Sequence, residues 1–290
     1  MLYLTLFLFL LGIGGFFFIT TRASVILFES RKSRPDNHVY WIYRSPWLIW
    51  LIDRQFISSV ILLFQYSRLV KQVLDQVGTS GSGKRVLQVS CVFGNFSQRL
   101  ADCCHRFGEL FILDIMHSEV RHARHKLSTQ RQQAGSHYLQ ADAGAMPFQN
   151  GGFDHVISFF LFHELPPAMR QKVFDESLRV LKPGGSFVYG EFHKPDSPLV
   201  RRLSEIYFWI FEPYARSMRQ WNPTATLDTK AWRINRVTVM GGYFQVVSLE
   251  RLSTQRSEVG AVLTAPLDCR RPAARCHATG TREVLPQGVA

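Results

Sequence analysis

Polar and titratable side chains follow four short apolar segments of this chain, each at the point where the segment ends. They are the turn Gln88–Asn95, Asp114, Asp142 and the pair His163 and Glu164. A carboxylate accepts hydrogen bonds from hydroxyl and amine groups, and a glycine in a turn lets the backbone approach a ligand closely. An imidazole next to a carboxylate can move protons or ligate a metal ion. These residue types indicate a site for a polar small molecule.

Each of these residues also has a simpler structural interpretation. Asp114 would cap the N-terminus of the following helix. His163 would orient the loop around it, and Glu164 would pair with an arginine. Glu191 and His193 end a further apolar segment, and for them a place in the same crevice and a structural role carry equal weight. Three histidines of one predicted helix are interpreted as a solvated surface: His117, His122 and His125.

The elements that must position these residues follow from the apolar pattern. Short apolar segments alternate with helical stretches, which is typical of a parallel sheet with helices on both faces. The predicted strands are Arg85–Val89, Leu110–Asp114, Tyr138–Ala141, His155–Phe160 and Ser186–Phe192. The predicted helices are Gln98–Cys104, Glu119–Leu127 and Met169–Val180, and a closing antiparallel pair is predicted at Val237–Val239 and Phe244–Ser248. We interpret Lys182-Pro183-Gly184-Gly185 as a tight turn.

The predicted fold class is therefore α/β, a Rossmann-like, doubly wound and mostly parallel sheet that occupies residues 84–255. In such a sheet the ligand binds beyond the carboxyl ends of the strands, where the strand order reverses. The four polar segments fall at those ends. Residues 256–290 are rich in Arg, Pro, Ala, Gly and Thr, with little to bury, and predict a disordered tail.

Residues 1–21 predict a transmembrane signal anchor. Residues 2–19 contain no charged side chain, and as a helix they would span about 27 Å, close to one bilayer core. The basic residues Arg22, Arg31 and Lys32 come afterwards. The positive-inside rule then places everything downstream on the cytoplasmic, or mitochondrial matrix, side of the membrane. A cleaved signal peptide, the alternative, usually begins with basic residues.

Residues 22–83 predict a basic amphipathic region that associates with anionic membrane lipid. From Arg22 to Lys71, eight Lys and Arg stand against three Asp and Glu, interleaved with aromatic residues. Asp53 and Arg54 interrupt its apolar stretch and disfavour a second membrane span. The stretch fits a helix lying on the membrane, an N-terminal core helix, or both. Its helical repeat comprises Phe56, Val60, Leu63 and Phe64.

Residues 84–250 resemble the class I methyltransferases that depend on S-adenosylmethionine (SAM). The resemblance rests on a strand and glycine turn, an acidic residue after strand two, Ala-Asp-Ala after strand three, and Leu-Lys-Pro-Gly-Gly before strand five. It implies that Asp114 accepts hydrogen bonds from the ribose hydroxyls, Asp142 binds the adenine amine, and the Gly94 turn lies against the methionine portion. The implied cofactor site comprises Val89, Ser90, Cys91, Gly94, Asn95, Asp114, Ile115, Asp142, Ala143 and Phe159.

The first turn departs from the methyltransferase pattern. Those enzymes usually have an acidic residue and three alternating glycines, where this chain has Gln88, Ser90, Val92 and Gly94. Val92 is β-branched and would resist a positive φ. The sequence therefore predicts that the loop is rebuilt or that SAM is held differently.

These departures are similar to the rhodoquinone biosynthesis proteins. The similarity lies in Leu-Gln-Val-Ser-Cys-Val-Phe-Gly-Asn, Phe-Phe-Leu-Phe-His-Glu-Leu-Pro, Glu212-Pro213 and Gly241-Gly242-Tyr243-Phe244-Gln245, although a tyrosine is expected where Phe93 stands. It implies replacement of a ring methoxy group of ubiquinone by an amino group, with SAM as amino donor and a manganese-type divalent ion. The catalytic residues it suggests are His163 and Glu164, and no metal ligands are assigned.

Three functions remain open from the sequence. The first is this amination of ubiquinone, and the second is methyl transfer to a quinone or another lipid. The third is a non-catalytic accessory protein with a SAM fold. The segment Leu199–Trp221 mixes aromatic residues with arginines and suits either a prenylated quinone arriving from the bilayer or a helical core under a basic surface. The net charge of +12 would also suit nucleic acid, but the sequence contains no nucleic-acid-binding motif.

Overall fold

The computed structural model describes the following residues: 5, 8, 9, 11, 12, 14, 15, 49, 50, 52–77, 83–104, 108–127, 135–210 and 213–252. For residues 209, 210, 213 and 214 it describes the backbone alone. The chain divides into the units Met1–Ser253 and Thr254–Ala290, and the second unit, with the predicted tail, lies outside the described residues.

A seven-stranded sheet with the order β3-β2-β1-β4-β5-β7-β6 forms the centre of the described unit. Its strands are β1 Lys84–Val89, β2 Gly108–Asp114, β3 Ser136–Gln140, β4 Phe153–Phe159, β5 Leu181–Phe192, β6 Trp232–Val239 and β7 Phe244–Arg251. The first five run parallel, while β7 is antiparallel to both β5 and β6. The strand order reverses between β1 and β4, because the chain runs outward from β1 to β3 and then crosses back to place β4 on the other side of β1. The predicted fold class and the closing antiparallel pair are confirmed.

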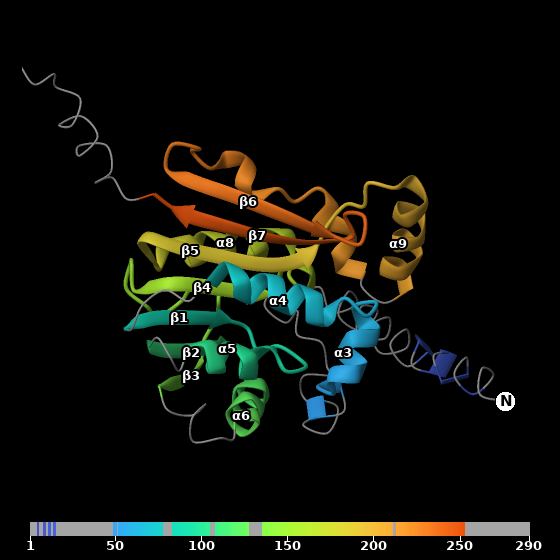
Figure 1. Ribbon diagram of the computed structural model, residues 1–290, viewed down its shortest axis with the longest axis horizontal. Helices are drawn as coiled ribbons and strands as arrows, with labels where there is room; N and C mark the ends of the chain where they lie inside the picture. Colours follow the sequence, from blue (N-terminus) through green and yellow to red (C-terminus); the bar gives the residue numbers. More distant parts are fainter. Residues whose placement is uncertain are drawn as a thin grey trace, which may run out of the picture. The chain divides into compact units, whose positions relative to one another are not determined.

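Helices cover both faces of the sheet, with α4 and α5 on one face and α8 on the other (Figure 1). The helices are α3 Gln55–Ile61, α4 Tyr66–Val77, α5 Phe96–Cys104, α6 His117–Lys126, α8 Pro167–Arg179 and α9 Pro198–Ile210. Short 3₁₀ helices are η2 Phe162–Glu164, η3 Pro213–Arg219 and η4 Pro223–Thr226. Successive strand residues alternate between the faces, so Val86 packs in the core under α4 and Leu87 in the core under α8.

The sequence Lys182-Pro183-Gly184-Gly185 lies within β5, which corrects the prediction that it forms a turn before the strand. Leu181 pairs with Phe153, whereas Ser186 pairs with His155, so five positions on β5 correspond to two on β4. Gly184 takes up part of the excess with a φ of 77°. The segment is an irregularity inside a longer strand, because pairing resumes on both sides of it.

The N-terminal part of the described chain divides into two helices. The repeat predicted from Phe56 to Phe64 is interrupted, because α3 ends at Ile61 and both Leu63 and Phe64 have positive φ. The following helix, α4, buries Leu69, Val70, Val73 and Val77 against the sheet. The helix that packs in the core is α4, which follows the stretch in which a core helix was predicted. The described helices α3 and α4 belong to the same compact unit as the sheet.

The predicted membrane anchor, residues 1–21, lies mostly outside the described residues, which include seven of its positions. Within the part of the chain that the structure describes, no helix has both the length and the apolar character needed to cross a bilayer.

Candidate functional site

A cavity of about 180 Å³ opens at the carboxyl ends of β1, β2 and β4, where the strand order reverses. Residues far apart in the sequence meet there because parallel strands end at the same edge. Eight of the predicted site residues line it: Ser90, Cys91, Asp114, Ile115, Asp142, Ala143, Phe159 and Glu164. Four predicted residues do not line it: Val89, Gly94, Asn95 and His163.

Asp114 stands at the end of β2 as a firmly held carboxylate. The N–H of Cys91 donates to its Oδ2 at 2.7 Å, and the N–H of Met116 donates to its Oδ1 at 2.8 Å. Burial raises the pKa of Asp114, and these two N–H donors act in the opposite direction. The N-cap of α6 is Met116, so the helix-cap interpretation of Asp114 is wrong. Its carboxylate connects the first turn to the end of β2.

The first turn places its left-handed residues at Ser90 and Gly94, with φ of 74° and 78°. Val92 does not adopt a positive φ, so the conflict expected there does not arise. Ser90 is held in this unusual conformation on both sides. Its N–H donates to the carbonyl of Leu113 at 2.8 Å, and its carbonyl accepts from Nε2 of the buried Gln88 at 2.9 Å. The turn thus has its left-handed residues at Ser90 and Gly94, and whether this means a rebuilt loop or a different way of holding SAM stays a prediction.

Gly94 supports the turn from outside the cavity. A Cβ at this position would lie 2.5 Å from Oη of Tyr66, so only glycine fits against that ring. The Tyr66 hydroxyl donates to the carbonyl of Phe93 at 3.2 Å. Burial raises the pKa of Tyr66, so the hydroxyl keeps its proton for this bond.

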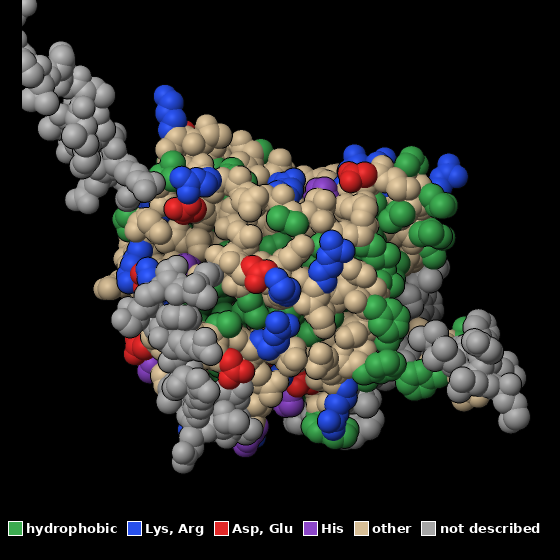
Figure 2. Space-filling model, viewed as in Figure 1, with side chains coloured by type: hydrophobic (Ala, Val, Ile, Leu, Met, Phe, Trp, Pro, Cys, Tyr) green, Lys and Arg blue, Asp and Glu red, His purple; other side chains and the backbone are tan. Residues whose placement is uncertain are grey.

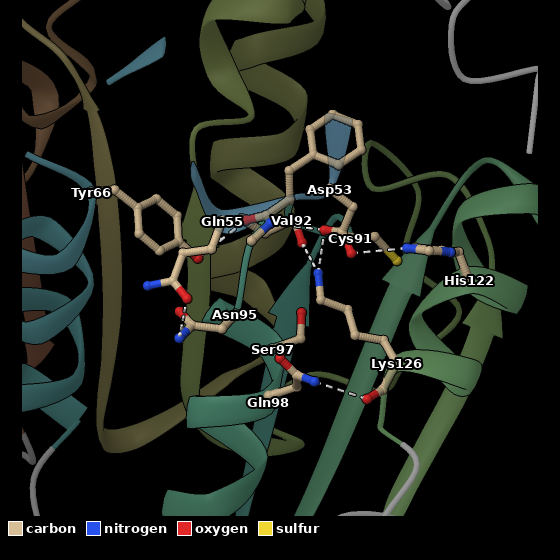
Figure 3. A network of polar contacts seen from close by, with 12 residues as sticks. Asp53, Gln55, Tyr66, Cys91, Val92, Asn95, Ser97, Gln98, His122 and Lys126 are labelled. Atoms are coloured by element: carbon tan, nitrogen blue, oxygen red, sulfur yellow. Dashed lines mark hydrogen bonds and ion pairs between the residues drawn. The ribbon is translucent and has the colours of Figure 1, made fainter. Parts of the chain in front are cut away.

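Asp53 organises a polar network behind the same turn (Figure 3). Its Oδ1 accepts from the Gly94 N–H at 2.8 Å and lies 2.5 Å from Nζ of Lys126, while its Oδ2 lies 2.9 Å from Nε2 of His122. Lys126 also donates to the carbonyl of Val92 at 3.0 Å. Asp53 thus ties the segment before α3 to the first turn and to α6.

Sequence reasoning missed this network. Asp53 was interpreted only as an obstacle to a membrane span, and His122 as part of a solvated surface. The side chains of Asp53 and His122 are 12% and 24% exposed, so the interpretation of His122 is wrong. His117 and His125 on α6 fit that interpretation, because both are exposed. A carboxylate inside an apolar stretch was the signal that could have revealed Asp53.

Glu119 is a second residue that sequence reasoning missed. It lines the cavity beside Asp114 and is 6% exposed, and its Oε1 has no hydrogen-bond partner among the described residues. Burial raises the pKa of Glu119 to about 8, and the negative charges of Asp114 and Asp53 add to the effect. At neutral pH Glu119 is therefore a neutral carboxyl that can donate a hydrogen bond into the cavity.

Glu119→Gln is expected to make the stability of the fold less sensitive to pH. The pKa of Glu119 rises from 4.5 to about 8 on folding, so the folded state retains a proton that the unfolded state has lost. Between these values the wild type loses up to about 1.4 kcal/mol of unfolding free energy per pH unit, and the glutamine variant does not. Denaturant unfolding at about pH 5, 6, 7 and 8 measures this. A constant difference between the two proteins would contradict the assignment.

Asp142 lies at the other acidic position of the cavity, after β3. Its Oδ1 accepts from the N–H of Gly144 at 2.7 Å, which fixes the carboxylate in a tight turn. The side chain is exposed and lines the cavity beside Ala143. Because β2 and β3 are neighbours in the sheet, Asp114 and Asp142 are presented at adjacent strand ends.

The side chains of His163 and Glu164 lie in different surroundings in the structure. Glu164 lines the cavity, but the ring of His163 is directed into the core. Its Nδ1 lies 3.0 Å from Oε1 of the fully buried Glu191, and the rings of Phe160 and Phe192 pack edge-on against it. The prediction that His163 faces the crevice is corrected by this buried pair, and Glu191, for which both interpretations were left open, is buried with it. His163 instead orients the loop after β4, as the alternative proposed.

The part of the chain that the structure describes contains no group of three or more His, Cys, Asp or Glu that could hold a metal ion. The manganese-type ion implied by the resemblance therefore has no fitting ligand set among those residues. The residues that line the cavity do fit SAM. They include the carboxylates of Asp114 and Asp142 and part of the first turn, and the other walls are largely apolar.

Comparison with known proteins gives a family match. Residues 54–221 match the profile described as the ubiE/COQ5 methyltransferase family. The ubiquinone/menaquinone biosynthesis C-methyltransferase UbiE of Ectopseudomonas mendocina (strain ymp) is 30% identical over 148 residues, 51% of this chain and 57% of that protein. The protein of the same name from Pseudomonas entomophila (strain L48) is 28% identical over 57% of this chain and 62% of its own length. The chain thus aligns with less than two thirds of the length of each of these two relatives.

Among solved structures, a SAM-dependent methyltransferase from Aquifex aeolicus aligns at a TM-score of 0.46 and 20% identity. The alignment covers 72% of this chain and 99% of that one. The fold assignment depends on the strand order described above. The family match confirms the expectation that SAM is the cofactor.

Proposed function

This chain belongs to the ubiE/COQ5 methyltransferase family, and on that basis we propose that it is a SAM-dependent transferase acting on a prenylated benzoquinone. The observation that carries the proposal is the cavity at the strand ends, where Asp114 and Asp142 face apolar walls. The two relatives named above are C-methyltransferases of ubiquinone and menaquinone biosynthesis by their names. A quinone ring is an apolar, planar substrate that such walls would accept.

The reaction we propose is replacement of a ring methoxy group of ubiquinone, which leaves with a proton as methanol, by an amino group that SAM donates, and the product is rhodoquinone. The first turn supports this choice, because Gln88, Ser90 and Val92 depart together from the methyltransferase pattern. Methyl transfer to the quinone ring is the second candidate, and the names of the relatives favour it. Both reactions need the same two parts, a SAM pocket and an acid–base group beside the ring.

Glu164 is the acid–base group that the cavity offers to the substrate. It lies on η2 directly after β4, and it lines the cavity together with the apolar residues Phe160, Leu165 and Met169. Phe160 has a φ of 56°, and its N–H donates to the carbonyl of Gly190 at 2.9 Å. A non-glycine residue in this region is strained, and such strain concentrates at functional sites. These contacts hold the apolar wall against which the ring would lie while Glu164 moves a proton.

The quinone pool of a host cell tests the proposal. We expect a host that makes ubiquinone but not rhodoquinone to accumulate rhodoquinone when it expresses the full chain, as read by mass spectrometry. The product is lighter than ubiquinone by the difference between a methoxy and an amino group. A quinone heavier by one methyl group would establish the second candidate instead. An unchanged quinone pool would favour a non-catalytic accessory role.

We also propose that the protein works at a membrane, with its SAM domain on the cytoplasmic or mitochondrial matrix side. Apolar side chains are exposed on α3, on the turn that follows it and on α9, and both helices lie at the end of the sheet where the parallel strands finish (Figures 1 and 2). The hydroxyl of Tyr207 on α9 donates to the carbonyl of Ile61 at the end of α3, at 3.2 Å. The exposed residues are Phe56, Phe64, Leu199, Leu203 and Ile206. They form an apolar surface beside a site for an apolar substrate.

Full-length protein is expected to sediment with membranes and to stay there in high salt. Burial of apolar residues, among them the predicted anchor 1–21, would dominate over charge, and salt screens only the charge. Deletion of residues 1–21 is expected to leave a weaker, salt-sensitive attachment through the basic region. Flotation of both proteins with and without about 1 M salt measures the difference. Recovery of the intact chain in the supernatant at low salt would contradict the proposal.

A further inference from the structure

A second cavity, of about 460 Å³, lies beside the start of α9. Its walls come from the end of β5 and the loop after it, from α9, from η3 and the residues that follow, and from β6 and β7. Among the described residues it shares none of its lining with the cofactor cavity. Its volume lies in the range typical of small-molecule sites.

The lining of this second cavity is strongly basic. It contains the four cations Lys194, Arg201, Arg219 and Arg236 but one carboxylate, Asp196. Arg219 also pairs with Glu205, a residue outside the lining. Cations gathered in a concave site raise the local concentration of anions.

Two of these arginines are already held in place by the fold. Arg201 donates from Nε and Nη2 to the carbonyl of Pro195, at 3.3 and 3.2 Å. Arg219 donates from Nη2 to Oγ of Ser204 at 2.8 Å and is 14% exposed. A ligand would therefore meet guanidinium groups whose conformational freedom is already lost, which favours binding.

Buried polar atoms of the lining lack partners within the described part of the chain. They are Nε of Arg219, Nε1 of Trp221 and Oε1 of Gln245. The first two are N–H donors that an anion would satisfy, whereas the third is an amide oxygen, an acceptor that an anion would not satisfy. A buried donor without an acceptor is costly, so an acceptor-rich ligand would offset that cost.

We propose that this cavity binds a phosphate group. Its cations come from separate elements, namely the loop after β5, α9, η3 and β6, which suits a tetrahedral group with several anionic oxygens. The phosphate belongs either to a soluble compound or to a phospholipid headgroup. A phospholipid would also find an apolar surface next to the cavity. The helix α9 contributes Arg201 to the lining and exposes Leu199 and Leu203. The site is independent of the reaction proposed above.

Pyrophosphate binding to the full chain, measured by calorimetry, tests the site. The double variant Lys194→Gln, Arg236→Gln removes two exposed cations that the fold does not use in a salt bridge among the described residues. It should bind pyrophosphate at least about tenfold more weakly. The matched control is Arg233→Gln, on the same strand as Arg236 but paired with Glu250 and outside the lining. It should bind like wild type.

Vesicles distinguish the two sources of phosphate. The same proteins are floated with phosphatidylcholine vesicles that contain or lack about a third phosphatidylglycerol, enough to attract basic residues. If the double variant loses affinity for the anionic vesicles alone, the ligand is a lipid headgroup. If it loses affinity for pyrophosphate, a soluble phosphate compound is supported. The proposal is overturned if the double variant matches Arg233→Gln in both assays, or if wild type binds neither ligand.

Discussion

Glu164→Gln is expected to abolish the quinone product while SAM binding stays within about twofold of wild type. A positioned acid–base group contributes roughly 10²–10⁴ to a rate, and glutamine cannot take or give the proton. Glu164 lines the cavity, whereas the carboxyl groups assigned to the cofactor lie on other strand ends. Quinone analysis of expressing cells measures the product, and calorimetry measures SAM affinity.

Two further variants make this prediction specific. Glu250→Gln changes an exposed glutamate of β7 that pairs with Arg233, and it should leave the product unchanged. His163→Ala removes a buried ring that packs against Phe160 and Phe192 and should destabilise the fold by about 3 kcal/mol. Product formed by Glu164→Gln at the wild-type level would remove Glu164 from the proposed mechanism.

Asp114→Ala is expected to weaken SAM binding to the full chain by at least about tenfold, or 1.4 kcal/mol. The carboxylate is held by the N–H groups of Cys91 and Met116, so it is already oriented toward the cavity before a ligand arrives. A charged acceptor makes the stronger hydrogen bonds to ribose hydroxyls, and alanine makes none. Calorimetry with SAM measures the change.

The alanine variant also leaves the Cys91 and Met116 N–H groups without their acceptor, which could loosen the turn. Asp114→Asn separates the two effects, because the amide oxygen can keep one of these bonds while the charge is lost. We expect thermal unfolding of the asparagine variant close to wild type and SAM binding still reduced. Asp175→Asn, on an exposed part of α8, serves as the control. SAM affinity unchanged by both Asp114 variants would contradict the assignment.

The sequence predicts the parts of the site that the topology imposes. Asp114 and Asp142 were predicted because the ends of adjacent parallel strands must lie together, whatever the loops do. The missing glycines predicted a rebuilt turn or a different way of holding SAM, but they did not predict the left-handed conformation of Ser90. That conformation depends on Gln88 and Leu113, which contact Ser90 only in the folded chain.

Other residues depend on packing that no local pattern contains. Glu119 is unusual because it is buried, and burial is a property of the whole fold. The ring of His163 follows the buried Glu191 rather than the adjacent Glu164. Asp53 has partners on the first turn and on α6, neither of which its neighbours in sequence suggest. Their roles appear only once the strands and helices are assembled.

The network around Asp53 also bears on how the protein folds. Asp53 meets Gly94, His122 and Lys126 across sequence separations of 41, 69 and 73 residues. The chain loses the entropy of closing loops of this size before the contacts lower its free energy. Contacts between residues far apart in the sequence therefore slow folding. The first turn therefore gains the support of Asp53 late in folding, after α3, β1 and α6 have come together. SAM binding in a refolding experiment would then report completion of the domain rather than formation of its first strand and turn.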